Sequence, residues 1–388
     1  MKRNMTETTP RDRVHKALNH ETPDHPPLDL GSTPNTSITK IAYDNLKSHL
    51  DISLKTEPVF LSKSMQVVAV DEVVLERLQI DTRPVFVDPP DTNESGAISE
   101  DSYVDEWGIR FRAAKIDGRI FYYDPVEYPL SGATTVRDIE KHRWPDPYDP
   151  GRTRGLREKA RNLRQSTDYA LVGHMGDTSI FQNCHDLRGM EQFFLDLLMN
   201  KRIARALLEK VFEIQSIKME KYLDEVGPYL DVVGVGDDLA GQSGPLISLD
   251  LYREMIKPYH RAYFELIKRK TPAKLHLHSC GSVAYFLDDL IEIGVDIINP
   301  VQVSARDMDP EKLKERFGRR ICFWGGIDTQ HLLPRGTRED VTREVRRVVS
   351  LLGRDGGYVL GAVHNIQADV PPGNVVAMYD AATQPNQP

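Results

Sequence analysis

The chain has 388 residues, of which 40% are hydrophobic and 28% are charged, and its formal net charge is −8. This composition is typical of a globular protein with a sizeable core and excludes an intrinsically disordered chain. The acidic balance, without a long run of Lys or Arg, argues against nucleic acid as a partner and favours a small molecule or another protein.

Nothing near the start of the chain resembles a targeting or membrane segment. Residues 1–27, MKRNMTETTPRDRVHKALNHETPDHPP, contain no apolar stretch suited to a signal peptide, and no apolar run in the chain has membrane-spanning length. We therefore expect a cytoplasmic protein with no membrane partner. The cysteines Cys184, Cys280 and Cys322 are too few and too scattered for a disulfide framework.

The first predicted element is a strand over residues 26–30, PPLDL. Residues 80–150 then contain three stretches that read as strands separated by turns, and an extended linker: RPVFVDPP, YVDEWGIRFRAAK, RIFYYDPVEYPL and RWPDPYDPG. We predict that residues 80–150 form a hairpin-rich insertion between early elements of the fold, near the mouth of the pocket.

The second half of the chain alternates short apolar runs with helical patterns. The runs end in Gly, Asp, Asn or His: YALVGHMGD, YLDVVGVGDD, AKLHLHSCG, VDIINPVQ, RRICFWGGID and GYVLGAVHN. Helices are predicted over residues 202–226, 248–270 with Ser248 as N-cap, 282–294, 309–318, and 337–353 with Gly353 as the stop signal. Apolar strands that alternate with helices imply a parallel sheet covered by helices.

This alternation predicts an α/β protein whose fold is a (β/α)8 TIM barrel. We expect a single domain over residues 1–380 and a disordered tail over residues 381–388. An open doubly wound sheet is the alternative, but no phosphate loop of the G-x-G-x-x-G type opens a helix in this chain.

Polar side chains follow almost every predicted strand of the second half. Because catalytic groups of barrel enzymes lie at the C-terminal ends of the strands, these residues are candidates for the site. They are His174 and Asp177, Asp237 and Asp238, His278 and Cys280, Asn299 and Gln302, Asp328 and His331, and His364 and Asn365.

Asp237 and Asp238 are the candidate catalytic carboxylates, although acidic residues at a strand end can also cap the next helix. We expect a second group to bind substrate, with a structural loop role as the alternative for each member. This group consists of His174, Asp177, Gln242, Asn299, Gln302, Asp328 and His331.

The pair His278 and Cys280 is the strongest signal of a metal site. Alternate residues of a strand share a face, so the imidazole and the thiolate, both zinc ligands, can reach one ion, and Gly281 lets the backbone turn. The alternative is a core histidine beside a small buried cysteine. Catalytic zinc commonly has three protein ligands, and His364 is the predicted third ligand and a candidate catalytic residue, with a hydrogen-bonded loop histidine as the alternative.

The remaining ligand-type residues have weaker claims. His276 shares the face of His278 and should support the site from behind. Cys322 lies at the start of its run, which places it toward the barrel floor in a packing role. Cys184 could approach the pocket. If His364 is not the third ligand, we expect that ligand to be Asp237, Asp238 or Cys184.

Several motifs in the same order resemble the uroporphyrinogen decarboxylase superfamily over nearly the whole chain. They are TPRDRVHKALNHETPDHPPLDLG, DEWG, WPDP, GDD before GPLISLDLYREMIKPY, HSCGSV, GVDIINPVQ, FWGGIDTQHLLPRGTREDV and GAVHNIQADVPPGNVVAM. Within that superfamily they resemble the zinc-dependent, corrinoid-linked methyltransferases of the methylcobalamin:coenzyme M type. The resemblance implies a (β/α)8 barrel with its active site in the C-terminal mouth. It also implies zinc ligands in a His-x-Cys-Gly motif, which matches His278 to Gly281; where the family usually has a third, cysteine ligand, this chain has His364.

The resemblance also implies a reaction. Porphyrinogen decarboxylases carry arginine just after the first strand, whereas LDLGSTPNTSITK has none to hold a polyanionic substrate. The implied function is instead zinc-dependent methyl transfer between a corrinoid (cobalamin) protein and a small thiol, methoxy or methylamine compound. The corrinoid would arrive on a partner protein, because the D-x-H-x-x-G corrinoid motif is absent from the chain. Two alternatives stay open: a decarboxylase acting on a substrate other than a porphyrinogen, and a non-catalytic tetrapyrrole-binding barrel.

Overall fold

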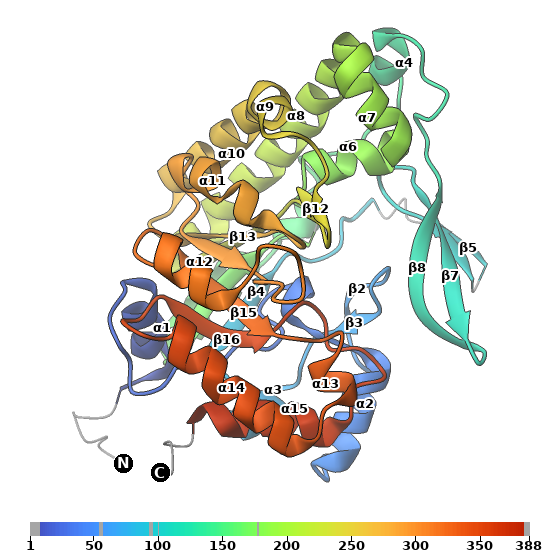
Figure 1. Cartoon of the computed structure of the whole chain (residues 1–388). Helices are drawn as coiled ribbons and strands as arrows, with labels where there is room; N and C mark the ends of the chain where they lie inside the picture. The colour runs from blue at the N-terminus through green and yellow to red at the C-terminus, as the bar shows by residue number, and fades with distance from the viewer. Residues whose placement is uncertain (1–7, 54–56, 93–95, 100, 177, 384–388) are drawn as a thin grey trace.

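The centre of the molecule is a parallel sheet of seven strands that curls into most of a barrel (Figure 1). The computed structural model describes residues 8–53, 57–92, 96–99, 101–176 and 178–383. Each strand of the sheet pairs with the next one along the barrel. In spatial order they are β4 (Thr82–Phe86), β9 (Ala170–His174), β10 (Val232–Gly236), β13 (Lys274–His278), β14 (Ile297–Asn299), β15 (Cys322–Ile327) and β16 (Tyr358–Ala362).

The predicted first strand closes the gap between β16 and β4. On one side, the N–H of Asp29 donates to the carbonyl of Leu360 at 2.9 Å and the N–H of Leu360 donates to the carbonyl of Pro27 at 2.8 Å. On the other side, the N–H of Asp81 donates to the carbonyl of Leu28 at 2.9 Å, and the N–H of Leu28 donates to the carboxylate of Asp81 at 2.7 Å. An eighth extended segment therefore completes the ring, and the prediction of a (β/α)8 barrel is confirmed.

The N-terminal end of the barrel is plugged by helix α1 (Pro10–Leu18). Val14 and Leu18 of this helix form one buried cluster with inward-facing strand residues, namely Ala170, Val172, Val232, Ile297, Cys322, Trp324 and Val359. The Cys322 sulfur lies 3.6 Å from the carbonyl oxygen of Leu18, so this cysteine belongs to the barrel floor. Only the opposite, C-terminal end can open to a ligand.

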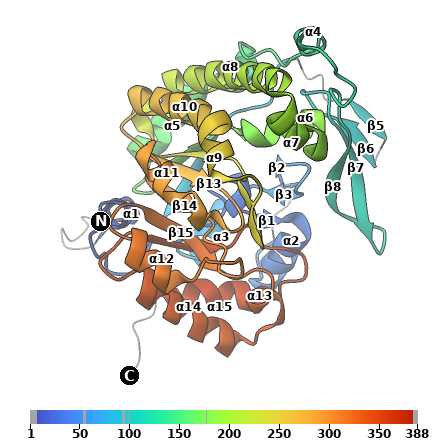
Figure 2. The same ribbon diagram turned by 45° about the horizontal axis from the view of Figure 1, so that its top comes forward.

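Helices cover the outer face of the barrel, with α8 and α10 on one side and α14 and α15 on the other (Figure 2). They are α2 (Lys40–His49), α3 (Glu72–Arg77), α5 (Leu156–Ser166), α6 (Phe181–Arg188), α7 (Met190–Met199), α8 (Lys201–Val226), α9 (Leu249–Leu251), α10 (Lys257–Lys270), α11 (Leu287–Glu292), α12 (Pro310–Phe317), α13 (Leu332–Arg335), α14 (Arg338–Leu352) and α15 (Pro372–Thr383). No helix among the described residues is both long enough and apolar enough to cross a membrane.

Two predicted helix boundaries are confirmed, whereas the predicted continuous helix over 248–270 and part of the predicted C-terminal tail are wrong. The Ser248 hydroxyl accepts from the N–H of Leu251 at 3.2 Å as an N-cap, and Gly353 is the C-cap of α14. The single helix predicted over 248–270 is interrupted by a π-helical turn over Tyr252–Ile256, just before Pro258, whose ring nitrogen has no hydrogen to donate. The tail predicted over 381–388 is wrong for residues 381–383, which are helical, and residues 384–388 lie outside the described part.

The insertion is a four-stranded antiparallel sheet with a short helix, α4 (Val136–Glu140). Its strands are β5 (Ala97–Ser99), β6 (Ser102–Val104), β7 (Arg110–Ile116) and β8 (Arg119–Glu127). The predicted range of 80–150 starts too early, because β4 pairs with β9 inside the barrel sheet.

The β7–β8 hairpin reaches over the C-terminal end of the barrel (Figure 1). The N–H of Tyr123 donates at 2.8 Å to the carbonyl of Ser64, in the turn between β2 (Phe60–Ser62) and β3 (Val67–Val68). Residues 118–121 at the hairpin tip line a small cavity together with Thr39, the last residue of the short strand β1 (Ile38–Thr39), and Ala368, in the loop after the last barrel strand. The insertion therefore lies near the barrel mouth, as predicted.

The carboxylate of Asp81 replaces a missing ladder hydrogen bond at the closing seam and also pairs with Arg13. We predict that Asp81→Ala lowers the free energy of unfolding by about 1 to 3 kcal/mol, because it leaves the buried N–H of Leu28 without its acceptor and leaves Arg13 with Asp24 as its remaining carboxylate partner. Asp44→Ala, which removes an exposed i,i+4 pair with Lys40, should cost at most about 0.5 kcal/mol. Urea unfolding checks both values; equal effects of the two variants would show that Asp81 does not secure the seam.

Candidate metal centre

Three side chains converge in the barrel mouth: His278 at the end of β13, Cys280 two residues later, and His364 two residues after β16. Their potential ligand atoms all lie within 4.8 Å of one another, and the Cys280 sulfur is 3.3 Å from His278 Nε2. Ligand atoms around a tetrahedral zinc, at bond lengths of about 2.0 to 2.3 Å, are separated by roughly 3.3 to 3.8 Å. The cluster therefore fits a zinc-sized ion after small side-chain movements.

The orientation of His278 is fixed by a neighbouring strand. Its Nδ1 lies 2.5 Å from Asn299 Oδ1, and Asn299 Nδ2 donates to the carbonyl of Trp324 at 3.1 Å, which orients the amide. The amide oxygen can only accept, so Nδ1 carries the hydrogen and Nε2 keeps its lone pair toward Cys280. The expectation that Asn299 binds substrate is wrong, because this residue is fully buried behind His278 with both amide groups engaged.

The turn after Cys280 is built for a glycine. Gly281 has φ +78°, and a Cβ there would lie 2.5 Å from the carbonyl oxygens of Ala240 and Gly241. The N–H of Gly281 donates to Gln302 Oε1 at 2.7 Å. Gln302, a predicted substrate-binding residue, therefore holds the ligand loop instead.

His364 occupies the left-handed region of backbone conformation, with φ +65°. This conformation is uncommon for residues other than glycine, although histidine adopts it more readily than most. The ring centroids of His364 and His278 are 5.2 Å apart. The left-handed turn after β16 thus brings this imidazole beside the one at the end of β13.

The protonation states of the cluster suit a cation. Burial lowers the pKa of both His278 and His364 to about 4, so their imidazoles are neutral and can act as ligands at neutral pH. Burial, and then the charge of Asp238, raise the pKa of Cys280 well above its ordinary value. A metal ion would supply the positive charge that a thiolate in this position lacks.

The two adjacent aspartates have different roles. The Asp237 carboxylate accepts from the N–H groups of Ile180, Phe181 and Gln182 at 2.9, 2.7 and 2.7 Å, and His260 Nε2 lies 3.0 Å away. It caps the start of α6 and is 3% exposed, so the catalytic assignment of Asp237 is wrong and the helix-capping alternative holds.

Asp238 faces the candidate ligands. Its Oδ1 accepts from the N–H of Cys280 at 2.7 Å and lies 4.0 Å from His278 Nε2. The side chain is 33% exposed, which leaves it accessible from the mouth. Burial raises its pKa, although the nearby His364 opposes that rise. Asp238 is thus the carboxylate that the structure places beside the cluster.

His174 and His276 lie deeper in the barrel. His174 is 3% exposed and its Nδ1 accepts from the N–H of Gly176 at 2.9 Å, so it does not face an entering substrate, contrary to expectation. His276 packs edge-on against Trp324 at 5.2 Å, and neither of its ring nitrogens has a hydrogen-bond partner among the described residues. The predicted Asp177 lies outside the described residues.

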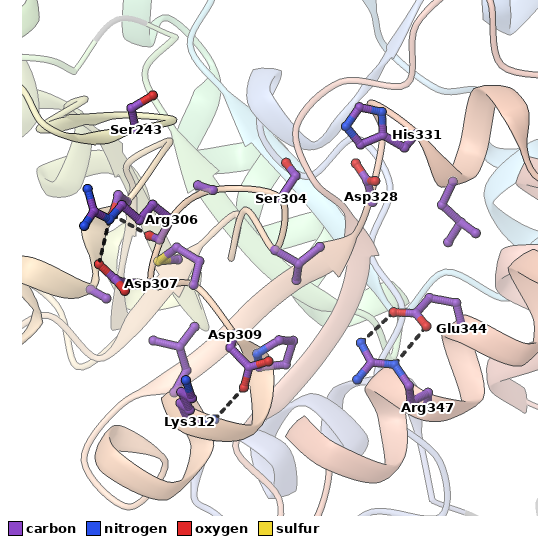
Figure 3. Close-up of a pocket in the computed structure, with 18 of the residues that line it drawn as sticks. Ser243, Ser304, Arg306, Asp307, Asp309, Lys312, Asp328, His331, Glu344 and Arg347 are labelled. Atoms are coloured by element: carbon purple, nitrogen blue, oxygen red, sulfur yellow. Dashed lines mark hydrogen bonds and ion pairs between the residues drawn. The ribbon is translucent and has the colours of Figure 1, made fainter.

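Within the part of the chain that the structure describes, the other predicted substrate residues make no hydrogen bond or ion pair with His278, Cys280 or His364. Gln242 Nε2 donates to Gln330 Oε1 at 3.1 Å. Asp328 and His331 line a cavity of about 1370 Å³ with Ser304 and Arg306 (Figure 3). Among the described residues that line it, none is a candidate metal ligand. Asp328 and His331 therefore line a separate cavity, and Gln242 pairs with Gln330.

Tyr122 of the insertion was missed by the sequence reasoning. Burial, then the charge of Asp124, and then those of Asp238 and Cys280 raise the pKa of Tyr122 to about 12, so the charges of the cluster act on its hydroxyl. Two helix residues belong to the same surroundings: the charge of Asp186 acts on Tyr122, and His185 acts on Asp238. The run RIFYYDPVEY does not reveal which of its tyrosines faces the mouth.

Fold and site together define an α/β barrel with a His/Cys/His cluster in its C-terminal mouth. A sequence model described as uroporphyrinogen decarboxylase (URO-D) matches residues 123–385, which is more than half of the chain. The chain belongs to the uroporphyrinogen decarboxylase family.

Its relatives are distant. It is 26% identical to the uroporphyrinogen decarboxylase of Chlorobium phaeobacteroides over 185 residues, 46% of this chain and 48% of that protein, so it matches about half the length of that relative. It is 24% identical to the enzyme of Hordeum vulgare over 292 residues, 70% of this chain and 84% of that protein. Among solved structures, a methyltransferase from Methanosarcina mazei has the same fold, with a TM-score of 0.62, 17% identity, and coverage of 97% of this chain and 98% of that one.

The different roles of the two aspartates predict different effects of substitution. Asp237→Ala should lower the free energy of unfolding by about 2 to 4 kcal/mol, because three N–H groups of α6 and a buried histidine lose their acceptor. Asp238→Asn should change it by less than about 1 kcal/mol, since the amide oxygen can still accept from the N–H of Cys280. Urea unfolding of the two variants measures both effects, and the reverse order would overturn the assignment.

The unpartnered His276 predicts a pH dependence. Burial, with smaller contributions from His278 and His174, lowers its pKa from 6.5 to about 3. Between these values the unfolded chain binds a proton that the folded chain does not, so the free energy of unfolding rises as pH increases from about 3 to about 6.5. His276→Leu should flatten this dependence by about one proton and keep the protein folded at neutral pH. Chemical unfolding at several pH values checks this; an unchanged slope would contradict it.

Proposed function

We propose that this protein is a zinc-dependent methyltransferase that moves a methyl group between a corrinoid held by a partner protein and a small thiol, methoxy or methylamine compound. The observation that carries the proposal is the convergence of His278, Cys280 and His364, with all ligand atoms within 4.8 Å, in the barrel mouth. The full-length fold match to a protein named as a methyltransferase supports it.

The donor set is suited to such chemistry. A bound zinc ion lowers the pKa of a coordinated thiol and withdraws charge from a coordinated oxygen or nitrogen. His278 and His364 would bind it as neutral ligands and Cys280 as a thiolate, which leaves the site one unit more positive than a set with two thiolates. The more positive site favours a substrate that must be deprotonated or polarised.

Other residues of the chain would act on the substrate directly. Asp238 holds the Cys280 loop through Oδ1, which leaves Oδ2 to accept a proton from a bound thiol. Tyr122 lies on the insertion that reaches over the mouth, where its hydroxyl can orient a polar substrate and its ring can exclude water.

A porphyrinogen is disfavoured as the substrate. The loop after the first strand presents the neutral residues Ser32, Thr33, Thr36 and Ser37, all buried, and no arginine. Carboxylates of a large substrate would have no guanidinium partner there. The curated relatives are named as decarboxylases, so decarboxylation of a smaller compound is the competing function.

Zinc content tests the ligand set. We predict about one zinc per chain in protein purified without chelator, and loss of most of it in Cys280→Ser, which should still fold because Cys280 lies at the rim and not in the core. Cys322→Ala, at the opposite end of the barrel, is the matched control and should keep its zinc. Metal analysis of the three proteins decides; equal zinc in wild type and Cys280→Ser would show that the site is misassigned.

His364 can be tested by two substitutions. His364→Ala should lower zinc affinity by at least about tenfold, since even residues that only support metal ligands typically contribute about 10- to 100-fold. It should also abolish methyl transfer from methylcobalamin to a panel of thiols. His364→Cys should keep zinc but slow the reaction, because a second thiolate makes the ion less positive. An alanine variant with full metal and full activity would leave His364 a loop residue.

The same assays separate the competing functions. Zinc below about a tenth of an equivalent, together with CO2 release from a carboxylated substrate, would favour the decarboxylase. Tight binding of a tetrapyrrole without turnover would favour the non-catalytic barrel.

A further inference from the structure

A second, small cavity lies apart from the metal centre, on the side of the barrel covered by α8. Val87 and Met175, which follow β4 and β9, form one wall, and Lys218 and Lys221 of α8 face them. The linker after the insertion adds Asp149 and Arg152. The cavity volume is about 40 Å³, and none of the candidate metal ligands is among the described residues that line it.

The lining of this cavity carries an excess of positive charge. Lys218, Lys221 and Arg152 are cationic, whereas Asp149 is the single acid among the described lining residues. The Asp149 carboxylate is already occupied: it accepts from the N–H groups of Asp91, Thr92 and Gly151 at 2.8, 3.0 and 2.8 Å, and from the Thr92 hydroxyl at 2.6 Å. It therefore has little capacity left for the lysines.

A second carboxylate, Glu106, reduces this excess without removing it. Glu106 lies outside the lining and bridges Arg152 and Lys218, with its Oε1 3.1 Å from the Lys218 ammonium. The two cations, acting against burial, lower the pKa of Glu106, so it is ionised. Three cations and two carboxylates leave one formal positive charge, which belongs to the exposed Lys221 and is solvated, so what the cavity leaves unmet is the hydrogen bonding of its buried donors.

Buried donors of this group lack acceptors. Lys218 is 4% exposed, and its ammonium has three hydrogens but one carboxylate within reach, Glu106; its other neighbour is the face of Trp107, with the ring centroid at 5.3 Å. Arg152 Nε is buried and has no hydrogen-bond partner among the described residues. Buried charged donors are normally satisfied, so both side chains point to a missing acceptor in the cavity.

We propose that this cavity binds one small monovalent anion, such as chloride or formate. A water molecule needs at least about 10 to 15 Å³ of such space, so the cavity holds a small group of waters or one compact anion. A monovalent ion can accept from the unsatisfied donors of Lys218 and Arg152, whereas a doubly charged phosphate or sulfate would bring more negative charge than the balanced buried groups can compensate. The bound anion would tie the linker to α8 at the ends of β4 and β9.

Thermal unfolding of the full chain tests this proposal. The unfolding midpoint is measured against increasing chloride, bromide or formate that replaces gluconate at constant ionic strength. We expect a saturable rise with the small anions, because a ligand that binds only the folded state stabilises it. Half-saturation at lower concentration with formate than with the halides would identify a carboxylate site, and the opposite order a halide site.

Variants assign the effect to the cavity. Arg152→Gln should raise the half-saturating concentration by about tenfold or more, the expected loss for a charge-assisted hydrogen bond. Arg154→Gln is the matched control, since Arg154 is 65% exposed and pairs with Asp91 outside the lining, and it should titrate like the wild type.

A direct measurement covers the case in which Arg152→Gln does not fold. Crystals of wild-type protein grown in bromide should show an anomalous scattering peak within hydrogen-bond distance of Lys218 Nζ and Arg152 Nε. A midpoint that depends on ionic strength alone, an equal loss in Arg154→Gln, or water at that position in bromide-grown crystals would overturn the proposal.

Discussion

The hydrogen bond between His278 and Asn299 determines what the barrel mouth can bind. It arises from the parallel register of β13 and β14, which places these two residues directly opposite one another. The carbonyl of Trp324 on β15 fixes the amide, so three consecutive strands together decide which imidazole nitrogen faces Cys280. If this alignment were lost, the ring could present either nitrogen and the cluster would lose its preorganised geometry.

Two adjacent aspartates near the barrel mouth have different roles, one structural and one close to the candidate ligands. Asp237 and Asp238 are neighbours, but alternation along the chain directs the first outward to the start of α6 and the second inward to the ligand loop. The outward carboxylate positions the helix that carries His185 and Asp186, both of which act electrostatically on the site. The candidate metal centre is therefore supported from outside the barrel as well as from within.

The barrel and the convergence of three ligand-type side chains at its mouth could be predicted because both follow from local pattern. Strands that end in His278, Cys280 and His364 must meet at one rim once they are parallel, whatever their loops do. The roles of Asn299 and Gln302 were not predictable in this way, because an amide at a strand end can face a ligand or a neighbouring side chain, and only tertiary contacts decide. The apolar run of β4 likewise fits a hairpin or a barrel strand equally well until its partner β9 is known.

The insertion was predicted as an element but its contribution to the site was not. A hairpin of alternating residues offers one face to the core and the other to its surroundings, and the sequence does not say where the hairpin lies. The hydrogen bond from Tyr123 to Ser64 fixes that placement, and it connects segments that are far apart in the chain. The charges of the cluster consequently act on Tyr122 through long-range packing, which the local pattern does not reveal.

The pairing of Leu28 with Leu360 has a consequence for how the protein is made. During synthesis the N-terminal segment leaves the ribosome long before its partner β16 exists, so the barrel cannot close until the chain is nearly complete. Until then the outer edges of the growing sheet present unpaired N–H and C=O groups, which are templates for association with other chains. A chain that stops short of β16 would keep both edges open and be prone to aggregate, even though it contains His278 and Cys280.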